Sequence, residues 1–173
     1  MAISFYEASV DTYLQIMPAI SGVLDKGLAH AKETDIDPKE IVETRLAPDM
    51  LPFRFQIHSV VHHSKGAIEG MKTGKFGPPS NLPEHDYAGL QSYLAEAISS
   101  LKAMSEAEVN ALENNEVIFE IRGMKMPFTA KGFLFSFSLP NFYFHASTAY
   151  DILRHKGTKI GKRDFMGAMN MKS

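Results

Sequence analysis

The stretch of residues 133–157 constrains the fold more than any other part of the chain. Its first half holds five phenylalanines, one tyrosine and one histidine. Apolar residues recur there at helical spacing, and Gly157 follows them as a C-terminal cap. The pattern predicts one long buried helix that ends at this glycine and carries His145 on its apolar side.

Three other amphipathic segments have the same helical spacing, at 4–31, 50–73 and 86–104. Residues 117–122 and 124–128 instead alternate with a period of two around Arg122 and Gly123, which predicts a β-hairpin. A short helix is expected over 37–45, and the Gly/Pro-rich stretch 75–83 is expected to be a linker loop. The predicted fold is therefore an all-α four-helix bundle with a short β-hairpin between helices three and four.

Composition limits the classes of function. The chain has 173 residues and fits one domain spanning 1–173. It has no cysteine, which excludes disulfides, zinc–thiolate centres and thiol nucleophiles. The formal net charge of −2 argues against a general nucleic-acid binder. With neither a signal-peptide pattern nor an apolar run long enough to span a membrane, we expect a cytoplasmic protein with no membrane partner.

His145 is the strongest candidate site residue, and three interpretations of it remain open. It is a core histidine bonded to a backbone carbonyl, a tyrosine or Gln56; or it joins His63 or His58 in a metal site; or it is a general acid or base without metal. The metal interpretation lacks a second histidine one turn further along the helix, because that position is Ala149.

The neighbouring histidines His58, His62 and His63 give a weaker signal. Adjacent helical residues point about 100° apart, so His62 and His63 are not expected to face one ion. His58 and His62 lie one turn apart and could face one ion, although the pattern places them away from the principal apolar face, on what is predicted to be a solvated polar side of their helix.

The runs FYEASVDTYLQIMPAISGVLDKG, DMLPFRFQIHSVVHHSKG and LPNFYFHASTAYDILRHKG, with KIGKRDF after them, resemble a bacterial family described only as a domain of unknown function, in the DinB-like superfamily. The resemblance covers nearly the whole chain. It implies a four-helix bundle, usually a homodimer. DinB-like proteins often bind a divalent metal through one histidine on helix two and two on helix four, spaced by four. Some relatives are metal-dependent thiol transferases or isomerases.

Carried over residue by residue, the resemblance places the first helix-four ligand at His145 and the second at Ala149, which has no donor atom. His63 is the expected helix-two ligand, with His62 and His58 as alternates. We therefore expect an uncharacterised DinB-like protein that binds a small molecule or a divalent metal, nickel or zinc, between helices two and four. Gln56, Tyr13 and Tyr150 are expected to lie near this pocket.

Two other hypotheses are a metal-dependent thiol S-transferase or isomerase, and a non-catalytic stress or interaction module that acts as a dimer. For the C-terminal run 159–167 we expect a packing strap across the bundle end, anchored by Phe165.

Overall fold

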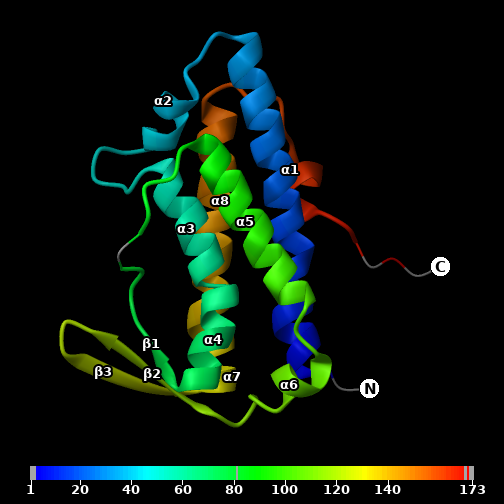
Figure 1. The fold of residues 1–173 in the computed structure, drawn as a ribbon, viewed down its shortest axis with the longest axis vertical. Helices are drawn as coiled ribbons and strands as arrows, with labels where there is room; N and C mark the ends of the chain where they lie inside the picture. The colour runs from blue at the N-terminus through cyan, green and yellow to red at the C-terminus, as the bar shows by residue number, and fades with distance from the viewer. Residues whose placement is uncertain (1–2, 81, 170, 172–173) are drawn as a thin grey trace.

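The structure is a computed structural model that describes residues 3–80, 82–169 and 171. Four long helical segments lie side by side and form a bundle, with a small sheet at one end (Figure 1). The predicted bundle with a hairpin between its third and fourth helices is confirmed. In chain order the elements are η1 Glu7–Asp11, α1 Thr12–Glu33, α2 Pro38–Glu43, α3 Phe53–His62, α4 Lys65–Thr73, β1 Lys75–Phe76, α5 Tyr87–Lys102, α6 Glu106–Asn110, β2 Glu116–Ile121, β3 Met124–Thr129, α7 Ala130–Phe133, η2 Leu134–Ser138, α8 Leu139–His155 and α9 Lys162–Met166.

Local capping signals fix where several helices begin. The Ser4 hydroxyl accepts from the Glu7 backbone N–H at 3.1 Å, and the Glu7 carboxylate accepts from the Ser4 N–H at 2.7 Å. Ser105 caps α6 with the same reciprocal arrangement, and the Asp86 carboxylate caps α5 through the Gly89 N–H at 2.8 Å. These contacts satisfy backbone donors that have no partner inside the helix, so the N-terminal boundaries follow from the sequence.

The second long helix is broken, which corrects the prediction of one helix over 50–73. α3 ends at His62 and α4 begins at Lys65, and Ser64 between them has φ −114° and ψ −89°. The Ser64 hydroxyl donates to the Val60 carbonyl at 2.6 Å. A serine side chain that bonds a carbonyl one turn back competes with the backbone and bends a helix, which accounts for the break.

The fourth helix has the predicted extent, but it contains a π-helical turn, η2. Pro140 follows this turn, and a proline ring clashes with the carbonyl four residues earlier in a regular α-helix. That carbonyl belongs to Ser136, inside the wider π turn. Gly157 then ends the helix with φ 97°, as the sequence predicts.

The sheet has the order β1-β2-β3. The hairpin pairs Glu116 with Thr129 and Ile121 with Met124, in antiparallel register, as expected. The strand β1 was not expected: Lys75 and Phe76 pair in parallel with Ile118 and Phe119, where the sequence predicts a linker loop. A strand of two residues is too short to produce a periodic pattern. Residue 81, in the same predicted loop, lies outside the described residues.

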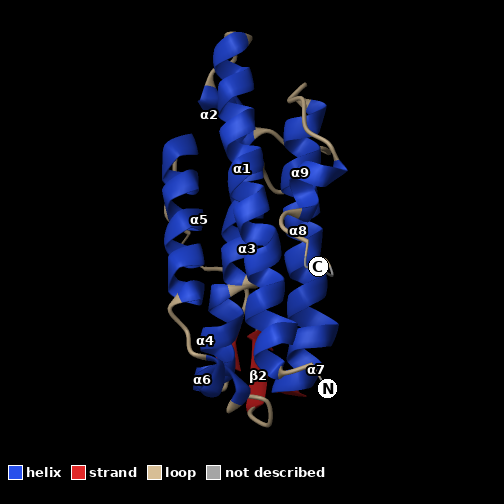
Figure 2. Ribbon diagram, turned by 90° about the vertical axis from the view of Figure 1, so that its right-hand side faces the viewer, coloured by secondary structure: helices blue, strands red, loops and turns tan. Residues whose placement is uncertain are grey.

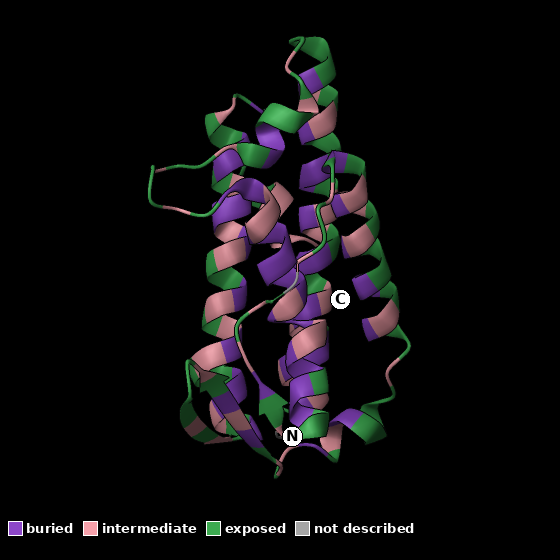
Figure 3. Ribbon diagram, turned by 60° about the vertical axis from the view of Figure 1, so that its left-hand side comes forward, coloured by how far each residue is buried: buried purple, intermediate pink, exposed green. Residues whose placement is uncertain are grey.

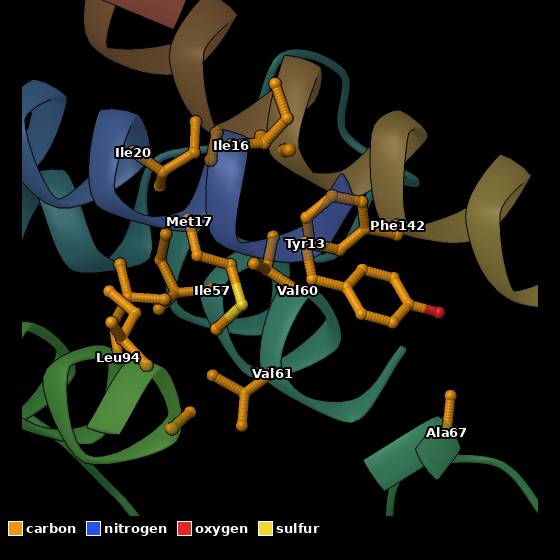
Figure 4. Packing of buried hydrophobic residues seen from close by; sticks show 14 of the residues in the cluster. Tyr13, Ile16, Met17, Ile20, Ile57, Val60, Val61, Ala67, Leu94 and Phe142 are labelled. Atoms are coloured by element: carbon orange, nitrogen blue, oxygen red, sulfur yellow. The ribbon is translucent and has the colours of Figure 1, made fainter. Parts of the chain in front are cut away.

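Side chains from the four long helices meet in one core (Figure 4). Tyr13 and Met17 of α1 lie against Ile57 and Val60 of α3 and Phe142 of α8, and all five are fully buried. The Tyr13 and Phe142 rings meet edge to face, with centroids 5.0 Å apart. The buried residues follow the inner faces of the helices along the bundle (Figure 3).

The C-terminal segment packs against the side of the bundle, along α1 (Figure 2), rather than across its end as the sequence analysis proposed. The Gln15 side-chain amide donates to the Met166 carbonyl at 3.1 Å, and Lys26 pairs with Asp164 at 2.5 Å. Phe165 does anchor this strap, because its ring meets Tyr150 edge to face at 5.9 Å. Within the described residues, every helix falls short of the length and apolar character that crossing a membrane requires.

Candidate functional site

Three imidazole rings gather where α3 ends and faces α8. The His62 and His63 ring centroids lie 5.1 Å apart, and those of His63 and His145 lie 5.8 Å apart with the planes only 9° from parallel. The break after His62 lets these adjacent residues place their rings near each other, where a continuous helix would spread them about 100° apart. The predicted proximity of His63 and His145 is confirmed.

A chain of hydrogen bonds orients His145. The side-chain N–H of Gln56 donates to the Leu51 carbonyl at 2.8 Å, which leaves the Gln56 side-chain oxygen facing His145. This oxygen accepts from Nδ1 of His145, also at 2.8 Å. Because a neutral imidazole carries one proton, Nε2 of His145 then holds a free lone pair. Gln56, predicted to lie near the site, is thus the direct partner of His145.

Burial keeps these rings neutral. Loss of hydration, with smaller contributions from the nearby His62 and His145, lowers the pKa of His63 to about 3. Loss of hydration also lowers the pKa of His145 to about 4, with a smaller contribution from His62. At neutral pH both side chains are uncharged imidazoles, the form that accepts hydrogen bonds and ligates metals. Nδ1 of His63 is buried and has no hydrogen-bond partner among the described residues.

Tyr13, expected to lie near the pocket, supports the site indirectly through Ser138. The Ser138 hydroxyl donates to the His63 backbone carbonyl at 2.7 Å. The Tyr13 hydroxyl lies 2.8 Å from the same Ser138 oxygen and is therefore the donor in that pair. Tyr13 and Ser138 are both fully buried, so the pair fixes the backbone at the helix break. No sequence motif marks Ser138 for this role, since it depends on residues 75 and 125 positions away.

Tyr150 also lies outside the site. Its hydroxyl donates to the Ile160 carbonyl at 3.4 Å and its ring packs against Phe165. Tyr150 lies five residues after His145 in α8, so its side chain points to a different side of the helix. Residues 158–166 fold back onto that side, and Tyr150 therefore packs against the C-terminal strap.

His58 is not on a solvated side, as the sequence predicted, but is only 1% exposed. The centroid of its ring lies 5.1 Å from that of His85 and 5.0 Å from that of Tyr93. His58 therefore packs against these two rings rather than against His145. The segment that connects β1 to α5 folds over α3 and covers His58, and periodicity along α3 alone gives no sign of this covering segment.

His62 connects the imidazole cluster to the protein surface. Its Nε2 donates to the Gly77 carbonyl at 2.8 Å, and its ring stacks on Phe76 at 4.4 Å. His62 also lines a groove of about 540 Å³ between α4 and residues 77–80, 82 and 83. His63 and His145 do not line this groove, so they lie behind it.

A three-histidine metal centre of the DinB-like kind does not fit these residues. The position one turn after His145 is Ala149, which has no donor atom and is fully buried. Within the described residues, no three histidine, cysteine, aspartate or glutamate side chains are arranged to hold a metal ion. Among the described residues the site offers two neutral imidazoles, His63 and His145, while the neighbouring His62 uses its Nε2 in the hydrogen bond to the Gly77 carbonyl.

A family model, the domain of unknown function DUF1993, matches residues 5–166. The chain belongs to this family. Its fold is also that of a DinB family member from Shewanella denitrificans, whose crystal structure superposes with a TM-score of 0.81 at 27% sequence identity. That likeness covers 97% of this chain and 94% of the other. No curated protein matches this DUF1993 chain. It is thus an uncharacterised DinB-like protein.

Proposed function

We propose that this DUF1993 protein binds one divalent transition-metal ion between α3 and α8 through His63 and His145. The observation that carries the proposal is the Leu51–Gln56–His145 chain of hydrogen bonds. Metal-ligating histidines nearly always donate their other ring N–H to a carbonyl or carboxylate, which fixes the tautomer and raises the basicity of the ligating nitrogen. The side-chain carbonyl of Gln56 occupies this supporting position.

The donor set favours nickel or zinc over magnesium or calcium, because neutral imidazoles suit the former and oxygen ligands the latter. Two protein ligands leave coordination positions for water or a small molecule. A bound ion would supply Lewis-acid chemistry at these positions. The rings of Phe55 and Phe144 flank His145, with centroids 5.8 Å and 5.2 Å from that of His145. A metal-dependent thiol transferase on the DinB-like pattern has less support, because Ala149 cannot complete the ligand set.

The test is binding of Ni²⁺ and Zn²⁺ to metal-free protein, measured by calorimetry and by elemental analysis after dialysis. We expect His145→Ala to lose one equivalent of metal relative to the unmodified protein. His155→Ala is the matched control, since His155 is an exposed histidine ten residues further along the same helix. Binding by the His145→Ala protein equal to that of the unmodified protein would rule out the proposal.

A second candidate function is that of a homodimeric interaction module. Phe135 is 56% exposed and Phe144 is 60% exposed, on the η2 and α8 segments of the fourth helix. Tyr143, next to Phe144 on α8, is 38% exposed, and exposed apolar side chains that gather into a patch are typical of interaction surfaces. Light scattering of the native protein gives the oligomeric state, and we expect Phe144→Ser to convert dimer to monomer. A monomeric unmodified protein would reject this candidate.

A further inference from the structure

A second pair of imidazoles lies on the other side of α3. The rings of His58 and His85 are 5.1 Å apart, centroid to centroid, and 15° from parallel. His58 comes from the middle of α3, whereas His85 comes from the segment that precedes α5. The Tyr93 ring contacts both, at 5.0 Å and 5.1 Å. His58 within α3 and His63 directly after it thus each lie opposite a histidine of another segment.

Three of the four ring nitrogens of this second pair are buried without a hydrogen-bond partner among the described residues. Both ring nitrogens of His58 and Nδ1 of His85 are buried without one. The Pro83 carbonyl lies close enough to His58 to raise its pKa, but the geometry between them falls outside that of a hydrogen bond. A buried polar atom without a partner costs about 1–3 kcal/mol, so three such atoms in two adjacent rings require a ligand or bound water.

The surroundings favour a cation as that ligand. His85 lines a cavity of about 380 Å³. The other charged side chains of this cavity are two cations, Lys39 and Arg54, and three carboxylates, Glu43, Glu84 and Asp86. Arg54 is paired with Glu43 at 2.7 Å, which offsets its repulsion of a positive ion. Burial holds His58 in its neutral form by lowering its pKa to about 4, with His85 contributing in the same direction.

We propose that His58 and His85 bind a second divalent transition-metal ion, independently of His63 and His145. Imidazole nitrogens suit zinc, nickel and copper, and among the described residues each ring has at least one buried nitrogen without a hydrogen-bond partner. The ion would join α3 to the segment between β1 and α5. This segment is already held at its start by the hydrogen bond between His62 and Gly77, and at its end by the Asp86 cap of α5.

The experiment uses a full-length protein in which His63 and His145 are both replaced by Gln, so that the first site is removed. We expect this protein to bind one equivalent of Zn²⁺ in competition with a chromophoric chelator. Adding His85→Asn should weaken this binding at least tenfold, because one of two ligands is lost. His85 is partly exposed, so its replacement should leave the core intact.

Two controls accompany it. Tyr93→Phe keeps the aromatic ring, and His30→Asn removes a histidine at the far end of α1. Both variants should bind Zn²⁺ with unchanged affinity. If the His63/His145 variant does not fold, His85→Asn alone should lose one equivalent relative to the otherwise unmodified protein. Absence of Zn²⁺ binding in the folded His63/His145 variant, or binding that His85→Asn does not weaken, would overturn the proposal and show that water fills the site. Neither result depends on whether His63 and His145 bind metal.

Discussion

The Ser138 hydroxyl donates a 2.7 Å hydrogen bond to the backbone carbonyl of His63. This contact joins two irregular points of the bundle, since Ser138 ends the π turn of the fourth helix and His63 follows the last residue of α3. The Tyr13 hydroxyl completes it from α1, so one buried network connects three of the four long helical segments.

Ser138→Ala should lower the free energy of unfolding by about 1–3 kcal/mol, because it leaves the Tyr13 hydroxyl and the His63 carbonyl buried without a partner. Urea unfolding measures the change. Ser59→Ala is the matched control: the Ser59 hydroxyl is buried in α3 and has no partner among the described residues, so its removal should cost nothing. Equal losses in the two variants would contradict the role of the network.

Gln56→Leu should weaken Ni²⁺ or Zn²⁺ binding at His145 by about 10–100-fold while leaving both histidines in place. The reason is that Nδ1 of His145 loses the oxygen that fixes its tautomer. Calorimetric titration gives the affinity. Gln91→Leu is the control, since Gln91 bonds Asp25 at the surface. If the Gln56 variant bound metal with unchanged affinity, Gln56 would be a packing residue only.

Gly27→Ala should destabilise the protein by about 1–3 kcal/mol through overpacking. A Cβ at Gly27 would lie 2.5 Å from the Tyr87 hydroxyl and 2.9 Å from a Leu153 methyl group. Gly22→Ala, in the same helix, meets no atom within 4 Å and should stabilise the protein by about 0.5–1 kcal/mol through helix propensity. Thermal and urea unfolding of the two variants should therefore change in opposite directions, and a shared direction would show that the close approach at Gly27 is tolerated.

Tyr13→Phe should alter how stability depends on alkaline pH. Burial raises the pKa of Tyr13 above its ordinary value of 10. Between pH 10 and the folded-state pKa, the unfolded chain releases this proton and the folded chain keeps it. The stability present below pH 10 is therefore lost as pH rises, by up to about 1.4 kcal/mol per pH unit. Urea unfolding from pH 9 to 11 should show a shallower decline for Tyr13→Phe, and parallel declines would refute the assignment.

Much of the fold could be predicted from short-range patterns. Ser4, Asp86 and Ser105 cap the starts of their helices through contacts with residues only three positions away, so these boundaries follow from local sequence. Gly157 ends the last long helix through another local effect, because the positive φ at this position favours glycine. The break at Ser64 also has a local cause. However, serine is so common within apolar helical patterns that its presence does not predict a break in the helix.

The site was only partly predictable. The sequence indicated that His145 lies on the apolar side of its helix and gave Gln56 and His63 among its possible partners, His63 with support from the family resemblance. It did not indicate the covering of His58, the pairing of β1 with β2, or the support of His63 by Ser138 and Tyr13. Each of these depends on segments brought together by packing.

The sequence by itself determined the helices, their caps, the hairpin and the inward face that carries His145, since these follow from periodicity and capping within a few residues. Tertiary structure alone decided which imidazoles face each other. The ring of His63 meets that of His145, and the ring of His58 meets that of His85, across 82 and 27 residues of chain. Such pairings are set by how buried surfaces of separate helices and loops fit together, which no local pattern encodes.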